Sequence, residues 1–401
     1  MKLKLRILIH FLVGLAIFLS ACGRPTPSQT ASPVNTPTTS PTSTKVILPT
    51  PTVEPPIYLS IIWHQHQPVY YQDPDTGIYE KPWVRVHAAK DYVDMAAMLK
   101  NYPELHVTFN LTPSLVRQLD DFQAGSKDLY WVMAEVPADQ LTEEQKEFLL
   151  DRFFDTNRKV IARFPRYQEL LDKRDSGGTY TVQDFRDLQV LFNLAWTDPD
   201  WLAQEPLASL VAKGANFAEA DKATVFSEHL RLIADVIPIH KELQDAGQIE
   251  VTMTPYAHPI LPLLMSTRLA LVANPTMDLP SKEFNYWQDA IDQVQLGVKL
   301  YQDHFGKAPV GMWPAEGSVA QQIVYMVSKA GMQWMASDEG VLAASLGMES
   351  FTRDSNEVVN EADTLYRPYY VQSSQGKPVA MIFRDVVISD KVGFTYSGVK
   401  G

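Results

Sequence analysis

Short apolar runs that end in polar clusters recur along this sequence, and segments with helical periodicity separate several of them. The first run, residues 57–63, stops at a cluster of histidine and glutamine. The other runs of strand length are residues 106–111, 249–254, 310–313, 334–337 and 379–383. Strands that alternate with helices predict a parallel sheet with crossover helices. We therefore expect an α/β fold over residues 57–401, most simply a barrel of β/α units.

A long amphipathic stretch lies between the second and third of these runs. Residues 129–240 mostly have helical periodicity, for example in 142–164 and 226–244. We interpret this stretch as a helical insertion or layer on the barrel.

Residues 310–338 have the pattern of a strand, a helix and a second strand. The helix is expected to begin at a Ser318 cap and to end at Gly331. In a right-handed crossover the two strands lie side by side and parallel, so Glu316 and Asp338 would follow the C-terminal ends of neighbouring strands. Adjacent strands are about 4.8 Å apart, and a retaining glycosidase needs carboxyl groups about 5 to 5.5 Å apart. The pair therefore fits retaining glycoside hydrolysis.

On spacing alone, a purely structural role for these two acids is as well supported as a catalytic one. Glu316 could be an acid at a helix start, where negative charge meets the helix dipole, and Asp338 a turn residue. Because Glu339 follows Asp338 directly, spacing also leaves open which of these two acids faces the site.

Two histidines follow the first predicted strand at alternate positions, His64 and His66, so an extended chain puts both imidazoles on one face. Such a pair suits sugar hydroxyl groups or a metal, and a purely structural role is the third alternative. Zinc would need a third ligand from His258 or an acid, and no motif identifies that ligand. We therefore assign no metal ligands.

Aromatic side chains also stand near the predicted strand ends. Tyr256 and His258 follow the run at 249–254, and Trp313 and Trp334 belong to the two strands around the carboxylate pair. Aromatic faces stack on the apolar faces of pyranose rings, although a single tryptophan is more often part of a core. We include Tyr256, Trp313 and Trp334 among the candidate substrate-binding residues.

Five segments, taken in order, resemble the signature regions of glycoside hydrolase family 57, the α-amylase and amylopullulanase group. They are residues 64–68, 247–259, 311–316, 334–338 and 383–394. The resemblance implies an incomplete seven-stranded parallel β/α barrel with helical insertions. It also implies that Glu316 is the nucleophile and Asp338 the general acid/base. The residues that it implies around the attacked glucose are His64, His66, His258, Trp313 and Asp385.

The resemblance implies a retaining enzyme that cleaves α-1,4 bonds of α-glucans such as starch and glycogen, without a cofactor. It leaves α-1,6 cleavage and a structural calcium open. A 4-α-glucanotransferase or branching enzyme would use the same site, with sugar instead of water as acceptor. A lipid-anchored sugar-binding protein and a metal-dependent deacetylase are the alternatives from other classes. Because the family continues past its fifth region, we expect a chain that stops short at Gly401.

The N-terminal residues predict export and a lipid anchor. Residues 1–21 have the basic start and apolar run of a signal peptide, and Leu19–Cys22 resembles a bacterial lipobox. Residues 22–56 form a linker, in which Pro, Thr and Ser make up 22 of the 34 residues after Cys22. Since Cys22 is the only cysteine, a disulfide within the chain is excluded. We expect a protein anchored at the extracellular face of a bacterial membrane.

The charge of the chain argues against nucleic acid as a partner. The formal net charge is -12, and removal of residues 1–21 with their three cations would make it -15. A neutral carbohydrate such as an α-glucan is compatible with this charge.

Overall fold

The computed structural model describes residues 57–396, and the chain divides into two units, Met1–Ile57 and Tyr58–Gly401. The expected signal peptide, Cys22 and the linker lie outside the described residues. All the described strands and helices belong to the second unit. No helix in residues 57–396 is long and apolar enough to cross a membrane.

Seven strands form two hydrogen-bonded sheets in the described part of the chain. They are β1 (Ile62–Gln65), β2 (Val107–Leu111), β3 (Ile249–Thr252), β4 (Gly311–Met312), β5 (Trp334–Asp338), β6 (Tyr369–Val371) and β7 (Val379–Arg384). The order is β1-β2-β3 in one sheet and β4-β5-β7-β6 in the other. All pairs are parallel except β6 with β7, which is antiparallel. The predicted α/β class is confirmed, whereas an all-parallel set of strands is wrong because of β6.

A single bridge between Met253 and Met312 connects the two sheets edge to edge, so that β3 is followed by β4. The Trp313 amide donates to the Met253 carbonyl at 2.9 Å and extends this connection. Within residues 57–396 no strand pairing joins β1 to β6 or β7, so the sheet is open rather than a closed barrel.

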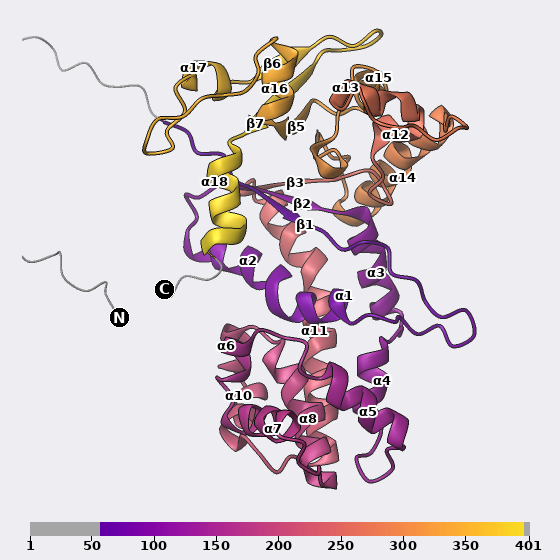
Figure 1. The fold of residues 1–401 in the computed structure, drawn as a ribbon. Coiled ribbons are helices and arrows are strands. Elements are labelled where there is room, and N and C mark those ends of the chain that lie inside the picture. The colour runs from indigo at the N-terminus through magenta and orange to yellow at the C-terminus, as the bar shows by residue number, and fades with distance from the viewer. Residues whose placement is uncertain (1–56, 397–401) are drawn as a thin grey trace, which may run out of the picture. The chain divides into compact units, whose positions relative to one another are not determined.

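The α-helices cover the strands and form a separate layer, as Figure 1 shows. They are α1 (Trp83–His87), α2 (Asp94–Ala97), α3 (Pro113–Gln123), α4 (Leu129–Glu135), α5 (Glu143–Arg152), α6 (Arg158–Ile161), α7 (Pro165–Asp175), α8 (Val182–Ala195), α9 (Pro199–Leu202), α10 (Leu207–Lys213), α11 (Glu219–Asp245), α12 (Leu261–Met265), α13 (Ala270–Ala273), α14 (Trp287–Phe305), α15 (Ile323–Lys329), α16 (Glu339–Ser345), α17 (Ala362–Leu365) and α18 (Val386–Asp390). The long helix α11 packs against α4, α8 and α10 in the helical layer and against α3 and β3 beside the strands.

Local sequence explains where several of these helices begin. Thr112 follows β2 directly and caps α3 by accepting a hydrogen bond from the Leu115 amide, with Pro113 in the first helical turn. A capping box at Thr142 starts α5. The expected helix at 142–164 is therefore divided, because α5 ends at Arg152 and Asn157 caps the short α6.

The helix between β4 and β5 differs from the prediction. Residues Ala315–Gly317 form a short 3₁₀ turn, and α15 begins only at Ile323, so Ser318 does not cap it. Glu316 and Gly317 both have positive φ, which an α-helix cannot contain. Gly331, with φ +93°, follows the end of α15 as expected.

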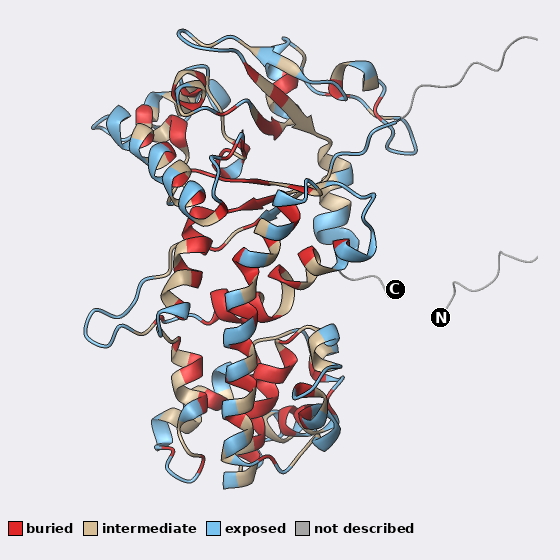
Figure 2. Ribbon diagram, turned by 180° about the vertical axis from the view of Figure 1, so that it is seen from behind, coloured by how far each residue is buried: buried red, intermediate tan, exposed pale blue. Residues whose placement is uncertain are grey.

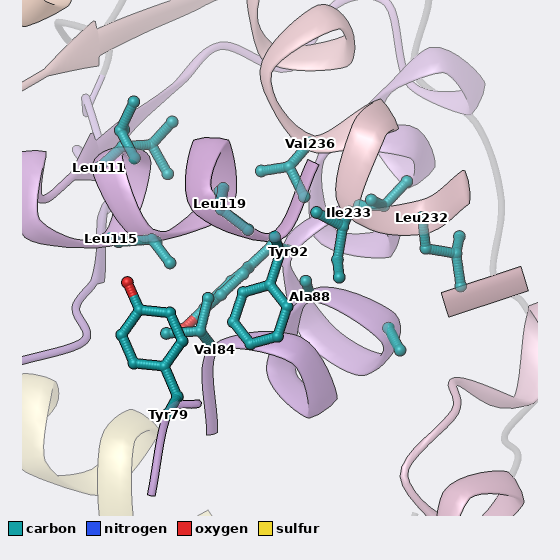
Figure 3. Close-up of a cluster of buried hydrophobic side chains, with 14 of the residues drawn as sticks. Tyr79, Val84, Ala88, Tyr92, Leu111, Leu115, Leu119, Leu232, Ile233 and Val236 are labelled. Carbon is teal, nitrogen blue, oxygen red and sulfur yellow. The ribbon is translucent and has the colours of Figure 1, made fainter. Parts of the chain in front are cut away.

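One hydrophobic core connects the strands to the helical layer. Figure 2 shows buried residues running without interruption from the strands into the helices. Figure 3 shows the part where α1, α3 and α11 meet. Its buried side chains include Val84, Ala88, Tyr92, Leu111, Leu115, Leu119, Ile233 and Val236.

A buried arginine connects three helices of this core. Arg85 is fully buried and forms two hydrogen bonds with the Asp128 carboxylate, at 2.5 and 3.1 Å. Its guanidinium also donates to the Asn193 side chain at 2.8 Å and lies 3.0 Å from the His229 ring. Every polar side chain in this cluster therefore has a partner, which is the condition for burying charge at tolerable cost.

We expect Arg85→Leu to lower the free energy of unfolding by about 3 to 5 kcal/mol, because it leaves the Asp128 carboxylate buried without its counterion. Chemical denaturation measures this change. Lys299→Leu, which breaks an exposed pair with Asp303, is the control and should cost less than about 0.5 kcal/mol. A cost at Arg85 no larger than at Lys299 would contradict the assigned role of the buried pair.

Candidate functional site

Polar side chains gather at the C-terminal ends of the parallel strands. His64 lies in β1 and His66 directly after it, while β3 leads to His258 and β4 to Trp313 and Glu316. The His64 and Trp313 rings are 6.0 Å apart between centroids. The structure thus brings together side chains from three strands that lie far apart in the sequence.

The three histidines form one cluster. The His66 and His258 rings are stacked with centroids 3.9 Å apart, and the His64 ring lies 5.4 and 5.5 Å from them. One ring nitrogen from each histidine lies within 4.8 Å of the other two. The cluster therefore offers several convergent nitrogen atoms to a ligand.

Asn110 holds the first of these rings in place. Its Oδ1 atom is 2.6 Å from His64 Nδ1, and its Nδ2 atom donates to Thr252 Oγ1 at 3.0 Å. The amide orientation gives His64 its proton on Nδ1 and leaves Nε2 free. Asn110 was not among the residues predicted from the sequence. Its only signal there was an amide side chain within the apolar run of residues 106–111, and the structure shows that this amide is fully buried.

Burial keeps the two stacked histidines neutral. Burial, reinforced by the nearby His258 and His64 rings, lowers the pKa of His66 to about 4. Burial and the His64 ring likewise lower the pKa of His258 to about 4. Near neutral pH both imidazoles are uncharged, and each can donate one hydrogen bond and accept another.

Glu316 stands beside this cluster in a constrained backbone conformation. Its φ is +55°, and its side chain is 69% exposed with Oε1 3.8 Å from His258 Nδ1. Ser337 donates to the Gly317 carbonyl at 2.6 Å, a buried contact between the end of β5 and the turn that carries Glu316. His258 also has positive φ, at +57°. The backbone of both residues is strained, and such strain is typical of functional sites.

Asp338 and Glu339 have different surroundings, although they are neighbours. Asp338 ends β5 and caps α16 through the Gly340 amide, and its Oδ2 atom is 3.1 Å from Arg384 Nη2. Glu339 is buried, and both of its oxygen atoms accept hydrogen bonds from Arg353, at 2.8 and 2.6 Å. Of the two, only Asp338 keeps substantial exposure, at 36% of its side chain.

Asp385, directly after β7, is tightly held. Tyr366 donates to its Oδ2 atom at 2.6 Å, while the Ile388 amide and Arg353 donate to Oδ1. Burial alone would raise the pKa of Asp385, but the hydrogen bonds from Tyr366 and the Ile388 amide outweigh it and lower the pKa. Asp385 is therefore a carboxylate whose oxygen atoms already have partners.

Trp334 and Tyr256 occupy different places. Trp334 is the first residue of β5, whereas Asp338 is its last, and the Trp334 indole donates to Glu250 at 2.8 Å. This contact places Trp334 near the N-terminal ends of the strands, whereas the histidines lie at the C-terminal ends. Tyr256 lies half-buried on the loop that leads from β3 to His258.

A cavity of about 290 Å³ extends from His64 and His66 toward α1. Its lining consists of Trp63, His64, Gln65, His66, Gln67, His87, Tyr92 and Met95. A second hollow lies beside α12, is mainly apolar and contains none of the site residues. His64 and His66 line the first cavity, which makes it the candidate ligand site at this end of the strands.

The chain matches the model of glycosyl hydrolase family 57 over residues 60–400. The comparison with curated proteins found no match.

Three solved structures are similar to the chain at low identity. An α-amylase from Thermotoga maritima has 16% identity and a TM-score of 0.42, with 83% of this chain and 46% of that chain covered. A branching enzyme from Thermococcus kodakaraensis has 17% identity and a TM-score of 0.44, with coverages of 85% and 50%. A 4-α-glucanotransferase from Thermococcus litoralis has 12% identity and a TM-score of 0.37, with coverages of 84% and 29%. The chain thus spans half or less of each, and the family assignment rests on the family model alone.

The positive φ of Glu316 predicts a measurable strain. Glycine adopts this conformation freely and alanine does not, so Glu316→Gly should be more stable than Glu316→Ala by about 1 to 2 kcal/mol. In a helix interior the stabilities have the opposite order, because alanine is there more favourable than glycine. Denaturation of both variants measures the difference, and an alanine variant as stable as the glycine variant would show that the turn carries no strain.

Proposed function

The chain belongs to glycosyl hydrolase family 57, and we propose that it is a retaining enzyme that cleaves α-1,4 bonds of α-glucans. Glu316 is the nucleophile and Asp338 the general acid/base. One observation carries this proposal: the two acids emerge from the C-terminal ends of β4 and β5, which are adjacent and parallel.

The reaction has two steps on these two carboxyl groups. The Glu316 carboxylate attacks the anomeric carbon while Asp338 gives a proton to the departing glycosidic oxygen. Asp338 then takes a proton from water, which attacks the glycosyl-enzyme ester and releases Glu316. Adjacent strands are about 4.8 Å apart, which is compatible with the separation of about 5 to 5.5 Å that this mechanism requires.

The surroundings of the neighbouring acid support Asp338 as the proton donor. Both oxygen atoms of Glu339 are occupied by Arg353, and one also accepts from the Val386 amide at 3.0 Å. Asp338 is held by one backbone amide and by Arg384, which is itself 37% exposed and can move aside for a sugar. Asp338 is thus the acid that a glycosidic oxygen can reach.

The attacked glucose lies in the cavity beside the histidines. Neutral His64, His66 and His258 donate and accept hydrogen bonds with its hydroxyl groups, and Trp313 contributes an aromatic face. Tyr256 contributes from the β3 loop. Asp385 positions Tyr366 and Arg353 at the end of β7. Neither reaction step uses a cofactor.

The fold of this enzyme is an incomplete β/α barrel of seven strands with the helical layer α4–α11 as an insertion. The continuous strand order through the Met253–Met312 bridge supports it.

The protein acts outside the cell, anchored to the bacterial membrane. Residues 1–21 direct export, Cys22 carries the lipid, and the Pro/Thr/Ser-rich residues up to 56 hold the catalytic part away from the surface. The partner is an α-glucan chain, and the acidic charge argues against nucleic acid.

Replacement of Glu316 by glutamine tests the proposal. We expect Glu316→Gln to lower kcat on starch by about 10⁴-fold or more, because the amide cannot form the ester intermediate. Glu147→Gln, at an exposed position on α5, is the matched control and should keep full activity. Hydrolysis that is equally fast in both variants would contradict the assignment of Glu316.

Product analysis with the native chain separates the alternatives. Retention predicts that the first sugar released from an α-glucan is the α-anomer, and release of the β-anomer would reject the mechanism. Longer or branched glucans would indicate a transferase, and sugar binding without any product would indicate a binding protein. Pullulan as substrate shows whether α-1,6 bonds are cut.

A further inference from the structure

The histidine cluster contains ring nitrogen atoms that no protein group satisfies. The Nε2 atoms of His66 and His258 are buried and have no hydrogen-bond partner among the described residues. His64 uses its Nδ1 atom for Asn110, so its Nε2 atom is the one left for the cluster. A buried polar atom without a partner is costly, so these two buried nitrogen atoms, beside the remaining nitrogen atom of the more exposed His64, indicate a ligand.

We propose that His64, His66 and His258 bind a divalent transition-metal cation of the zinc type through their Nε2 atoms. Neutral imidazole is a preferred zinc ligand, and three histidines are a common protein set for an ion that keeps one open position. One ring nitrogen of each lies within 4.8 Å of the others. Three nitrogen atoms around one zinc, each about 2.0 to 2.1 Å from it, require only a modest inward movement from that spacing.

One of the three rings already has the outer partner that a metal-binding histidine needs, and a second has a carboxylate close by. A ligating imidazole usually donates its second N–H to an oxygen atom, which orients the ring. Asn110 Oδ1 fills this role for His64 at 2.6 Å. Glu316 Oε1, 3.8 Å from His258 Nδ1, can fill it for His258 after a small side-chain rotation.

The stacked pair must open to share an ion. The His66 and His258 rings are nearly parallel, at 19°, and the lone pairs of parallel rings do not converge. No hydrogen bond holds the Nε2 atom of either ring, so ring rotation breaks none there. Metal binding therefore exchanges a ring stack for two coordinate bonds.

The ion would regulate the enzyme, because it would occupy the place of the sugar. This regulatory effect rests on the proposed function. The same three histidines surround the attacked glucose, and Glu316 lies against His258. An ion there excludes the sugar and engages the nucleophile through His258. The site thus binds either an α-glucan or a zinc-type cation, and the cation acts as a competitive inhibitor.

Titration with Co²⁺ tests metal binding directly. The full chain is used without a polyhistidine tag and is first dialysed against a chelator. Co²⁺ should bind once per chain with the intense visible absorption of a four-coordinate ion, and Zn²⁺ should displace it. Absence of this absorption would overturn the proposal. The readout needs no activity, so its failure is distinct from a failure of the proposed function.

Variants assign the ligands. His66→Asn and His258→Asn should each weaken Zn²⁺ binding by more than about 100-fold, and Asn110→Ala, which removes an outer partner, by about 10- to 100-fold. His106→Asn is the control, because His106 is exposed, lies outside the histidine cluster and hydrogen-bonds the Gly247 carbonyl. Circular dichroism identifies any variant that does not fold. Unchanged affinity in the folded variants would overturn the assignment.

Competition tests the regulatory part separately. Saturating maltooligosaccharide should weaken Zn²⁺ binding, and Zn²⁺ should raise KM without lowering kcat. Zn²⁺ binding that sugar leaves unchanged would overturn the competitive effect. Zn²⁺ binding to a chain that binds no sugar would contradict the proposed function and leave the metal site standing.

Discussion

The close contact between Trp334 and Gly311 is the constraint on which the geometry of the carboxylate pair depends. A Cβ atom at position 311 would lie 2.3 Å from the Trp334 ring, so only glycine allows β4 to pair with β5 in this register. The indole nitrogen also donates to Glu250 on β3, which holds the ring in this place. β4 has only two residues, so this contact at the start of the strands controls where Glu316 and Asp338 emerge at their ends.

The site combines an exposed carboxylate with a rigid backbone. Positive φ at Glu316 and His258 persists only where the surrounding structure holds it. The buried hydrogen bond from Ser337 to Gly317 holds the first turn. Gln293 on α14 holds the second, since its side chain accepts from the Ala257 amide at 2.7 Å. In the proposed reaction these groups are thereby positioned before a substrate arrives, which would reduce its ordering cost.

The apolar runs predicted the existence of the six parallel strands, because buried parallel strands have a clear sequence pattern. The bounds of the first run were wrong, since β1 begins at Ile62 and not at residue 57. β6 was missed, since Tyr369–Val371 is a short edge strand with little burial. The Ser318 cap was wrong because sequence does not reveal that Glu316 and Gly317 adopt positive φ. The histidines and Glu316 were found from residue type and position, whereas Asn110 needed knowledge of which strand faces which ring.

Trapping the reaction intermediate tests the central claim most directly. A slow fluorinated α-glucosyl fluoride should leave one glycosyl group on the native chain, and mass spectrometry of its peptides should find that group on Glu316. A glycosyl group on Asp338 or Glu339 would contradict the account. Turnover of an α-glucan by a chain that forms no ester with this reagent would contradict it as well.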